Sequence, residues 1–114
     1  MARNGQTMMR QYILSKLTGN GERLDVGRCC YHVSSGGRKY YLIVGLGRKV
    51  RGKGTDTVNL TPIHHDFGRT MGRAETTQLQ PLDVSDHVHF ETVLDAIGYN
   101  LEASLFYFLK AHYE

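Results

Sequence analysis

The segment RCCYHVSSGGRKYYLIVGL, residues 28–46, decides the fold class of this chain. Two runs rich in tyrosine and β-branched residues flank the turn residues Ser35, Gly36 and Gly37, so the segment predicts a β-hairpin. The second run, YYLIVGL, is apolar on both faces instead of alternating. That pattern is typical of a central strand covered on both sides, and we expect a helix to lie across it.

A helix is predicted before the hairpin. Thr7 is its candidate N-cap, apolar residues such as Tyr12, Ile13 and Leu17 follow at helical spacing, and Gly19 is its candidate stop. A strand over residues 12–17 is the alternative. The tract TGNGER that follows predicts a loop.

Two short strands and a second helix are predicted after the hairpin. β-Branched residues, together with Pro62 and Pro81 at places where strands end or run along an edge, indicate strands near 57–63 and 76–82. The second helix has Ser85 or Asp86 as its cap and Gly98 as its stop. Its apolar stripe occupies positions i, i+3, i+4 and i+7, which are Phe90, Val93, Leu94 and Ile97.

The last segment, residues 101–114, is interpreted as a strand, with a helix as the alternative. Strand alternation puts one apolar series on a single face: Leu101, Ala103, Leu105, Tyr107, Leu109, Ala111 and Tyr113. We therefore predict one α+β domain over residues 1–114, a small antiparallel β-sheet with one or two helices packed on one face.

Composition bounds the class of protein. Apolar residues make up 40% of the chain and charged residues 22%, which is ordinary for a folded domain. No run approaches the roughly 18 apolar residues of a membrane span, and the N-terminus lacks a secretory pattern. The only two cysteines, Cys29 and Cys30, are adjacent, a spacing that suits neither a loop-closing disulfide nor a zinc site. We expect a cytoplasmic protein with structural thiols.

Charge is unevenly distributed along the chain. Net charge is +2 over residues 1–27, +7 over residues 28–74 and −6 over residues 75–114, which together give the overall +3. Such polarity can present a positive face to an anion, or it can let the two ends of the chain pair with each other. Both interpretations remain open at this point.

A basic, glycine-rich loop is the main candidate site. Within GLGRKVRGKG, residues 45–54, four cations are interleaved with glycines: Arg48, Lys49, Arg51 and Lys53. Glycines let backbone amides approach an anion, and cationic groups neutralise it, so the loop suits a phosphate or a nucleic-acid backbone. The loop is neither a Walker motif nor a dinucleotide-binding GxGxxG. A solvated turn and a contact with an acidic protein surface are the alternatives.

Other residues could widen this positive face. The further candidate cations are Arg38, Lys39, Arg69 and Arg73, and the nearby tyrosines Tyr31, Tyr40 and Tyr41 could stack on bases. Because neighbouring strand residues point to opposite faces, at most one of Tyr40 and Tyr41 can face such a ligand. The other is expected in the core.

Metal binding and catalysis have weaker signals. His64, His65, His87 and His89 could form a metal site only if the last two shared a face, and the predicted helix separates them. No nucleophile motif is present, and Asp83 and Asp86 are explained as helix caps. We predict no cofactor and no catalytic residue, and favour a protein that is not an enzyme.

From about Arg48 onward the order of motifs resembles the CYTH, or triphosphate-tunnel, family. The matching features are an R-x-x-R strand, VNLTPI, GRAETTQL and FETVLDAIGYNLE followed by a C-terminal strand. The resemblance implies binding or hydrolysis of a triphosphate with a divalent metal, with Arg48, Arg51 and Arg73 as phosphate contacts. The chain departs from the family pattern because it has no N-terminal E-x-E-x-K, and Ile63 stands where a catalytic lysine is expected.

The sequence therefore favours a small binding protein that contacts a nucleic acid or nucleotide through its basic loop. One alternative is a protein-interaction or inhibitor module, of the kind that viruses and mobile elements carry, using acidic residues such as Asp83, Asp86, Glu91 and Asp95. The other is the triphosphate-binding or triphosphate-hydrolysing protein that the CYTH resemblance implies.

Overall fold

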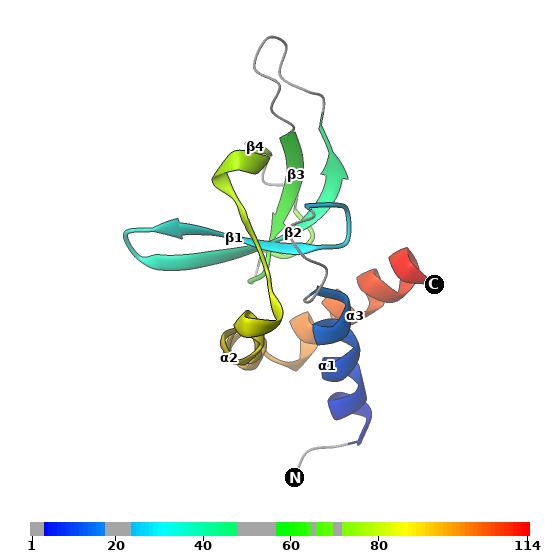
Figure 1. The fold of residues 1–114 in the computed structure, drawn as a ribbon. Coiled ribbons are helices and arrows are strands. Elements are labelled where there is room, and N and C mark those ends of the chain that lie inside the picture. The colour runs from blue at the N-terminus through cyan, green and yellow to red at the C-terminus, as the bar shows by residue number, and fades with distance from the viewer. Residues whose placement is uncertain (1–3, 18–23, 48–56, 65, 70–71) are drawn as a thin grey trace.

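The computed structural model describes residues 4–17, 24–47, 57–64, 66–69 and 72–114. Over these residues the fold is α+β, as predicted, with three α-helices and a five-stranded antiparallel sheet of order β4-β3-β2-β1-β5. The helices gather at one end of the molecule, and the β1–β2 hairpin projects away from the rest of the sheet (Figure 1).

The predicted hairpin is confirmed. β1 (Cys29–Ser34) and β2 (Gly37–Leu46) pair from Ser34↔Gly37 to Cys29↔Leu42, with Ser35 and Gly36 as the turn. β2 lies between β1 and β3, so it is central as its apolar run indicated. Its neighbouring residues Leu42 and Ile43 are both fully buried, on opposite faces of the sheet.

The other strands agree only in part with the prediction. β3 (Thr57–Pro62) confirms the strand predicted at 57–63, and β4 (Arg73–Glu75) pairs with it at the edge. The single strand predicted at 76–82 is wrong. That stretch is a 3-10 turn, η1 (Thr76–Gln78), followed by the two-residue β5 (Gln80–Pro81). The Leu79 N–H donates to the Thr76 carbonyl, and Pro81 has no N–H to continue a ladder.

The first two helices lie where the periodicity predicted them. α1 (Asn4–Leu17) begins before Thr7, so Thr7 is a residue within the helix and not its cap. The predicted stop, Gly19, is outside the described residues. α2 (His87–Ile97) follows a short 3-10 turn, η2 (Val84–Asp86), whose cap is Asp83. Gly98 ends α2 with φ of +85°, a conformation that favours glycine.

The C-terminal segment is a helix, and the strand predicted there is wrong. α3 (Tyr99–Tyr113) buries Glu102, Leu105 and Leu109, which recur at helical spacing. The alternating apolar series behind the strand prediction does not share one buried face. Leu101 and Ala103 are half-buried where α3 packs against α1 and α2, whereas Tyr107, Ala111 and Tyr113 are exposed. The fold consequently has three helices where one or two were expected.

Two hydrophobic clusters lie on the two sides of the sheet. The larger joins the helices to one face and includes Ile13, Leu42, Phe90 and Leu105. The smaller lies on the other face and includes Cys30, Ile43 and Leu79. Since the helices cover only the first face, the second is closed by the curl of the sheet and by the chain before β1. No helix in the described part is long and apolar enough to cross a membrane.

Candidate functional site

The basic residues proposed from the sequence do not form one group in the described structure. Arg48, Lys49, Arg51 and Lys53 lie outside the described residues, in the connection that follows the end of β2 at Leu46. Arg38 and Lys39 lie at the opposite end of β2, about 25 Å from Leu46 along the strand. Arg69 is exposed in the turn after β3, and Arg73 belongs to β4, where it is in register with Asn59.

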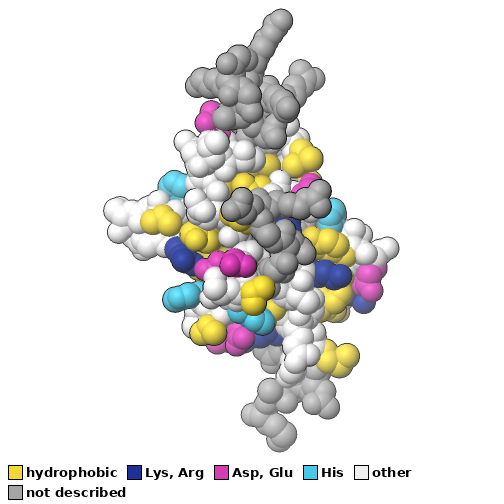
Figure 2. Space-filling model, in the orientation of Figure 1, with side chains coloured by type: hydrophobic (Ala, Val, Ile, Leu, Met, Phe, Trp, Pro, Cys, Tyr) yellow, Lys and Arg dark blue, Asp and Glu magenta, His cyan; other side chains and the backbone are white. Residues whose placement is uncertain are grey.

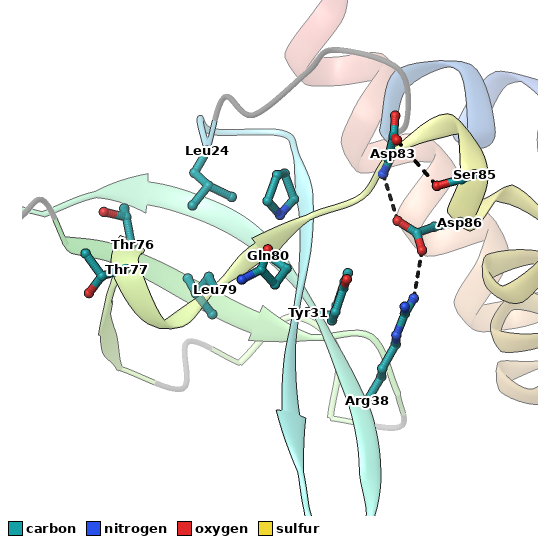
Figure 3. Close-up of a pocket in the computed structure, with 11 residues that line it drawn as sticks. Leu24, Tyr31, Arg38, Thr76, Thr77, Leu79, Gln80, Asp83, Ser85 and Asp86 are labelled. Atoms are coloured by element: carbon teal, nitrogen blue, oxygen red, sulfur yellow. Dashed lines mark hydrogen bonds and ion pairs between the residues drawn. The ribbon is translucent and has the colours of Figure 1, made fainter.

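Arg38 is held by an ion pair across the fold. Its Nη1 lies 2.8 Å from Asp86 Oδ1, and its guanidinium carbon lies 4.1 Å from the centroid of the Tyr31 ring (Figure 3). The hydrogen bond to Asp86 raises the pKa of Arg38 above its already high ordinary value. Arg38 therefore ties the hairpin to the start of α2, and much of its charge is neutralised.

Lys39 has a different environment from its neighbour. It is in register with His32 on β1, and both residues are exposed. No carboxylate among the described residues forms an ion pair with Lys39. Its ammonium group is thus available to an external anion.

The tyrosines of β2 face opposite sides, as predicted. The Tyr40 ring lies 5.6 Å from that of Phe90 and 5.9 Å from that of Tyr31, on the helical side of the sheet. Tyr41 packs on the smaller cluster. Both are half-buried, so neither presents a fully open stacking platform.

Two hollows lie on either side of Arg38. The first, of about 860 Å³, is open and polar, and Figure 3 shows Asp83, Ser85 and Asp86 at one end of it and Thr76 and Thr77 at the other. Its carboxylates are already engaged, because Asp83 caps the Val84 N–H and Asp86 accepts from both Arg38 and the Asp83 N–H.

The second hollow is a groove of about 590 Å³ between β2 and α2. The sheet contributes a basic and aromatic side, and the helices contribute an apolar side. The lining residues are Arg38, Lys39, Tyr40 and Tyr41 from β2, Ile63 and His64 from the bend after β3, and Val93, Ala96, Ile97 and Leu101 from the helices. Sequence reasoning identified Arg38 and Lys39 but not the groove, since no local signal in the sequence brings residue 38 beside residue 97.

The histidines are not gathered around a common point in the described part of the chain. His64 Nδ1 accepts the Asp66 N–H within its own turn, and His87 and His89 lie on α2. His65 is outside the described residues. No group of three histidine, cysteine or acidic side chains among those described could hold a metal ion. Cys29 and Cys30 are free thiols, fully buried in β1.

The acidic C-terminal third is largely paired within the fold. Arg10 on α1 bonds Glu102 through Nε and Nη2 at 3.1 and 2.6 Å, and it also reaches Asp95. Asp86 pairs with Arg38, and Glu114 with Lys110. The face drawn in Figure 2 accordingly shows basic and acidic side chains intermixed.

Comparison with known proteins adds no relative. No protein-family model, curated protein or solved structure matches this chain. The resemblance to the CYTH family also loses its C-terminal strand, because residues 99–113 are helical.

Proposed function

We propose that this chain is a small, non-enzymatic binding protein whose basic middle segment, residues 28–74, contacts a phosphate-bearing ligand, either a nucleic acid or a nucleotide. The contact would be mainly electrostatic, because the cations of this segment are numerous and no metal-holding group of side chains lies among the described residues.

The observation that supports this proposal is the distribution of ion pairs. Four of the seven acidic residues in 75–114 are engaged in them: Asp86, Asp95, Glu102 and Glu114. Of these four, only Asp86 pairs with a base of the middle segment. Among the described ion pairs, the acidic third therefore compensates α1 and its own Lys110 and meets the middle segment at Arg38. The +7 excess of the middle segment, which the sequence shows, is the charge that we propose to act on a partner.

The same pairing weakens the alternative of an acidic interaction surface. Asp86 and Asp95 already have basic partners, and Asp83 holds the cap of η2. A basic protein partner would have to displace these contacts. Glu91 is exposed and has no ion pair among the described residues, but it is a single charge.

The test is a salt titration of binding to labelled single- and double-stranded oligonucleotides. Wild-type affinity should fall steeply as the salt concentration rises. In the double variant Arg48→Glu, Arg51→Glu, the slope of log K against log salt concentration should become shallower by about 0.9 per lost phosphate contact on duplex DNA, or by about 0.7 per contact on a single strand. The control is the double variant Lys16→Glu, Lys110→Glu. It changes the net charge by the same amount, but on the face formed by α1 and α3. An equal effect of the two double variants, or no binding at low salt, would contradict the proposal. A nucleoside triphosphate as competitor separates nucleotide from polymer.

A further inference from the structure

The groove between β2 and α2 differs in charge from the open hollow on the other side of Arg38. Among the described residues that line the groove, two are cations, Arg38 and Lys39, and none is a carboxylate. The open hollow, by contrast, contains Asp83 and Asp86. The groove has a volume of about 590 Å³, a size that is common for small-molecule sites. It is therefore the hollow that favours a small anion.

Lys39 is the cation of the groove that the fold leaves available. Arg38 Nη1 lies 2.8 Å from Asp86 Oδ1, so much of the charge of Arg38 is neutralised. Lys39 is exposed and forms no ion pair with a carboxylate of the described residues. One available ammonium group matches a ligand that carries a single negative charge, such as a carboxylate.

The helical side of the groove is an aliphatic surface. Val93, Ile97 and Leu101 recur every four residues from α2 into α3, and all three line the groove. Each of them is only half-buried, although its side chain is wholly apolar. Covering such side chains with hydrocarbon is favourable because it removes apolar area from water. This surface therefore favours an aliphatic chain.

The charged and the aliphatic surfaces meet at the edge of β2. Tyr40 lies on the helical side of the sheet and Tyr41 on the other side, and both line the groove, so the groove crosses this edge. Lys39 shares the side of Tyr41, because side chains alternate along a strand. β3 ends at Pro62, opposite Tyr41, so no residue of β3 is in register with Lys39. A ligand that crosses the edge meets Lys39 at one end and the helices at the other.

We infer that this groove binds an aliphatic monocarboxylate, with the carboxylate at Lys39 and the hydrocarbon chain along Val93, Ile97 and Leu101. The ammonium group selects the sign of the charge, and the aliphatic surface makes affinity increase with chain length. The inference does not depend on the proposed nucleic-acid contact, because that contact does not require the aliphatic surface of the helices.

Chain length and charge can be varied separately in titrations of the full chain that follow its amide resonances by NMR. Hexanoate and octanoate differ by two methylenes, and affinity should rise about fourfold for each methylene that the aliphatic surface covers. Octylamine has a cationic group on the same chain and should bind at least about tenfold more weakly than octanoate. Equal affinities for hexanoate and octanoate, or for octanoate and octylamine, would overturn the inference.

Variants of the groove locate the binding. Ala96→Trp fills the groove from an exposed helix position and should weaken octanoate binding at least about tenfold. Ala111→Trp is the control, since it adds the same side chain at an exposed position of α3 that does not line the groove. Lys39→Glu should reverse the preference, so that octylamine binds more tightly than octanoate, a gain that misfolding cannot produce. An unchanged affinity in Ala96→Trp, or an unchanged preference in Lys39→Glu, would also overturn the inference.

The inference and the proposed function fail separately. Octanoate binding without any oligonucleotide binding would contradict the proposed function alone. Oligonucleotide binding without octanoate binding would contradict this inference alone. If both ligands bind, Ala96→Trp should lose octanoate but keep the oligonucleotide salt slope of the wild type. Loss of both ligands in Ala96→Trp but not in Ala111→Trp would overturn the inference of a separate carboxylate site.

Discussion

Arg10 is the residue on which the helical layer most depends. Its guanidinium reaches Glu102 on α3 and Asp95 on α2 from its position on α1. The Glu102 side chain is only 1% exposed, whereas that of Asp95 is 65% exposed. The hydrogen bond to Glu102, followed by that to Asp95, raises the pKa of Arg10, so the arginine stays charged under all conditions of interest.

Removing Arg10 should be far more damaging than removing its exposed partner. Arg10→Met leaves the Glu102 carboxylate buried without its counter-charge, which we expect to cost about 3–5 kcal/mol in the free energy of unfolding. Asp95→Asn removes an exposed ion pair and should cost less than about 1 kcal/mol. Urea unfolding of both variants measures the difference. Equal costs would contradict the assignment of Glu102 as the critical partner.

Asp86 gives the fold a specific dependence on acid. Burial acts to raise its pKa, but the Asp83 N–H and the Arg38 guanidinium outweigh burial and hold the pKa below the usual range, with a smaller effect from His89. Because the unfolded value is about 3.9, the stabilisation is complete above that pH and is lost as pH falls through the lower folded-state pKa.

Asp86→Asn should therefore reduce the loss of stability on acidification below about pH 4. Urea midpoints measured from pH 6 to pH 2 for the wild type and the variant test this expectation. Glu91→Gln is the control, since Glu91 is exposed and has no ion pair among the described residues. If the urea midpoints of the wild type and Asp86→Asn fell equally with pH, the Asp86 carboxylate would not contribute to the acid dependence of stability.

At the scale of elements, the projecting hairpin needs support from outside its own two strands. A two-stranded hairpin is marginal alone. Here Arg38 ties it to η2, and the Tyr31–Tyr40–Phe90 contacts join its base to α2. The same contacts hold the base of the hairpin against α2.

The chain just before β1 contacts the C-terminal end of α3 at Gly27. Gly27 has φ of +84°, and a Cβ there would lie 2.5 Å from His112 Cδ2. Its carbonyl also accepts the Tyr113 hydroxyl at 3.1 Å. Only a glycine satisfies both the backbone conformation and the close approach of α3.

Gly27→Ala should lower the free energy of unfolding by about 1–3 kcal/mol, because it combines an unfavourable φ with overpacking. Gly36→Ala is the control, since no heavy atom lies within 4 Å of its added Cβ, and it should change stability by less than about 0.5 kcal/mol. Thermal or urea unfolding separates them. A neutral Gly27→Ala would mean that the end of α3 moves away without cost.

At the scale of the whole molecule, α1 and α3 lie side by side, and the ion pairs of Arg10 join α1 to the C-terminal third (Figure 1). Of the two interpretations of the polarised charge, self-pairing therefore holds for the N-terminal helix. In the middle segment, Arg38 pairs with Asp86 of the C-terminal third.

The two thiols report on opening of the whole fold. Burial is the main cause that raises the pKa of Cys29 well above its ordinary value and that of Cys30 to about 12. We expect iodoacetamide to modify native protein only at the rate of global unfolding and to react readily in urea. Arg10→Met should accelerate the native reaction in proportion to its lost stability. Rapid modification of the stable wild type would contradict the complete burial of Cys29 and Cys30.

The sequence by itself determined the hairpin, the central place of β2, β3 and the first two helices. In each of them the local pattern and the burial agree, because a turn at Ser35–Gly36 or a stop at Gly98 acts within a few residues. The opposite faces of Tyr40 and Tyr41 followed from strand geometry alone.

Only the tertiary structure decided the C-terminal helix and the groove. Glu102 counts as a surface residue in any local pattern, yet it is buried because Arg10, 92 positions away, neutralises it. The buried face of α3 includes the charged Glu102, and apolar residues also lie outside that face. The sequence of α3 therefore shows no purely apolar stripe at helical spacing that local periodicity could detect. The groove likewise depends on β3 ending at Pro62, opposite Tyr41, and on α2 lying beside the part of β2 that extends beyond β3. Burial of a charge and closure of a groove both depend on partners that are distant in sequence, and a local pattern cannot contain them.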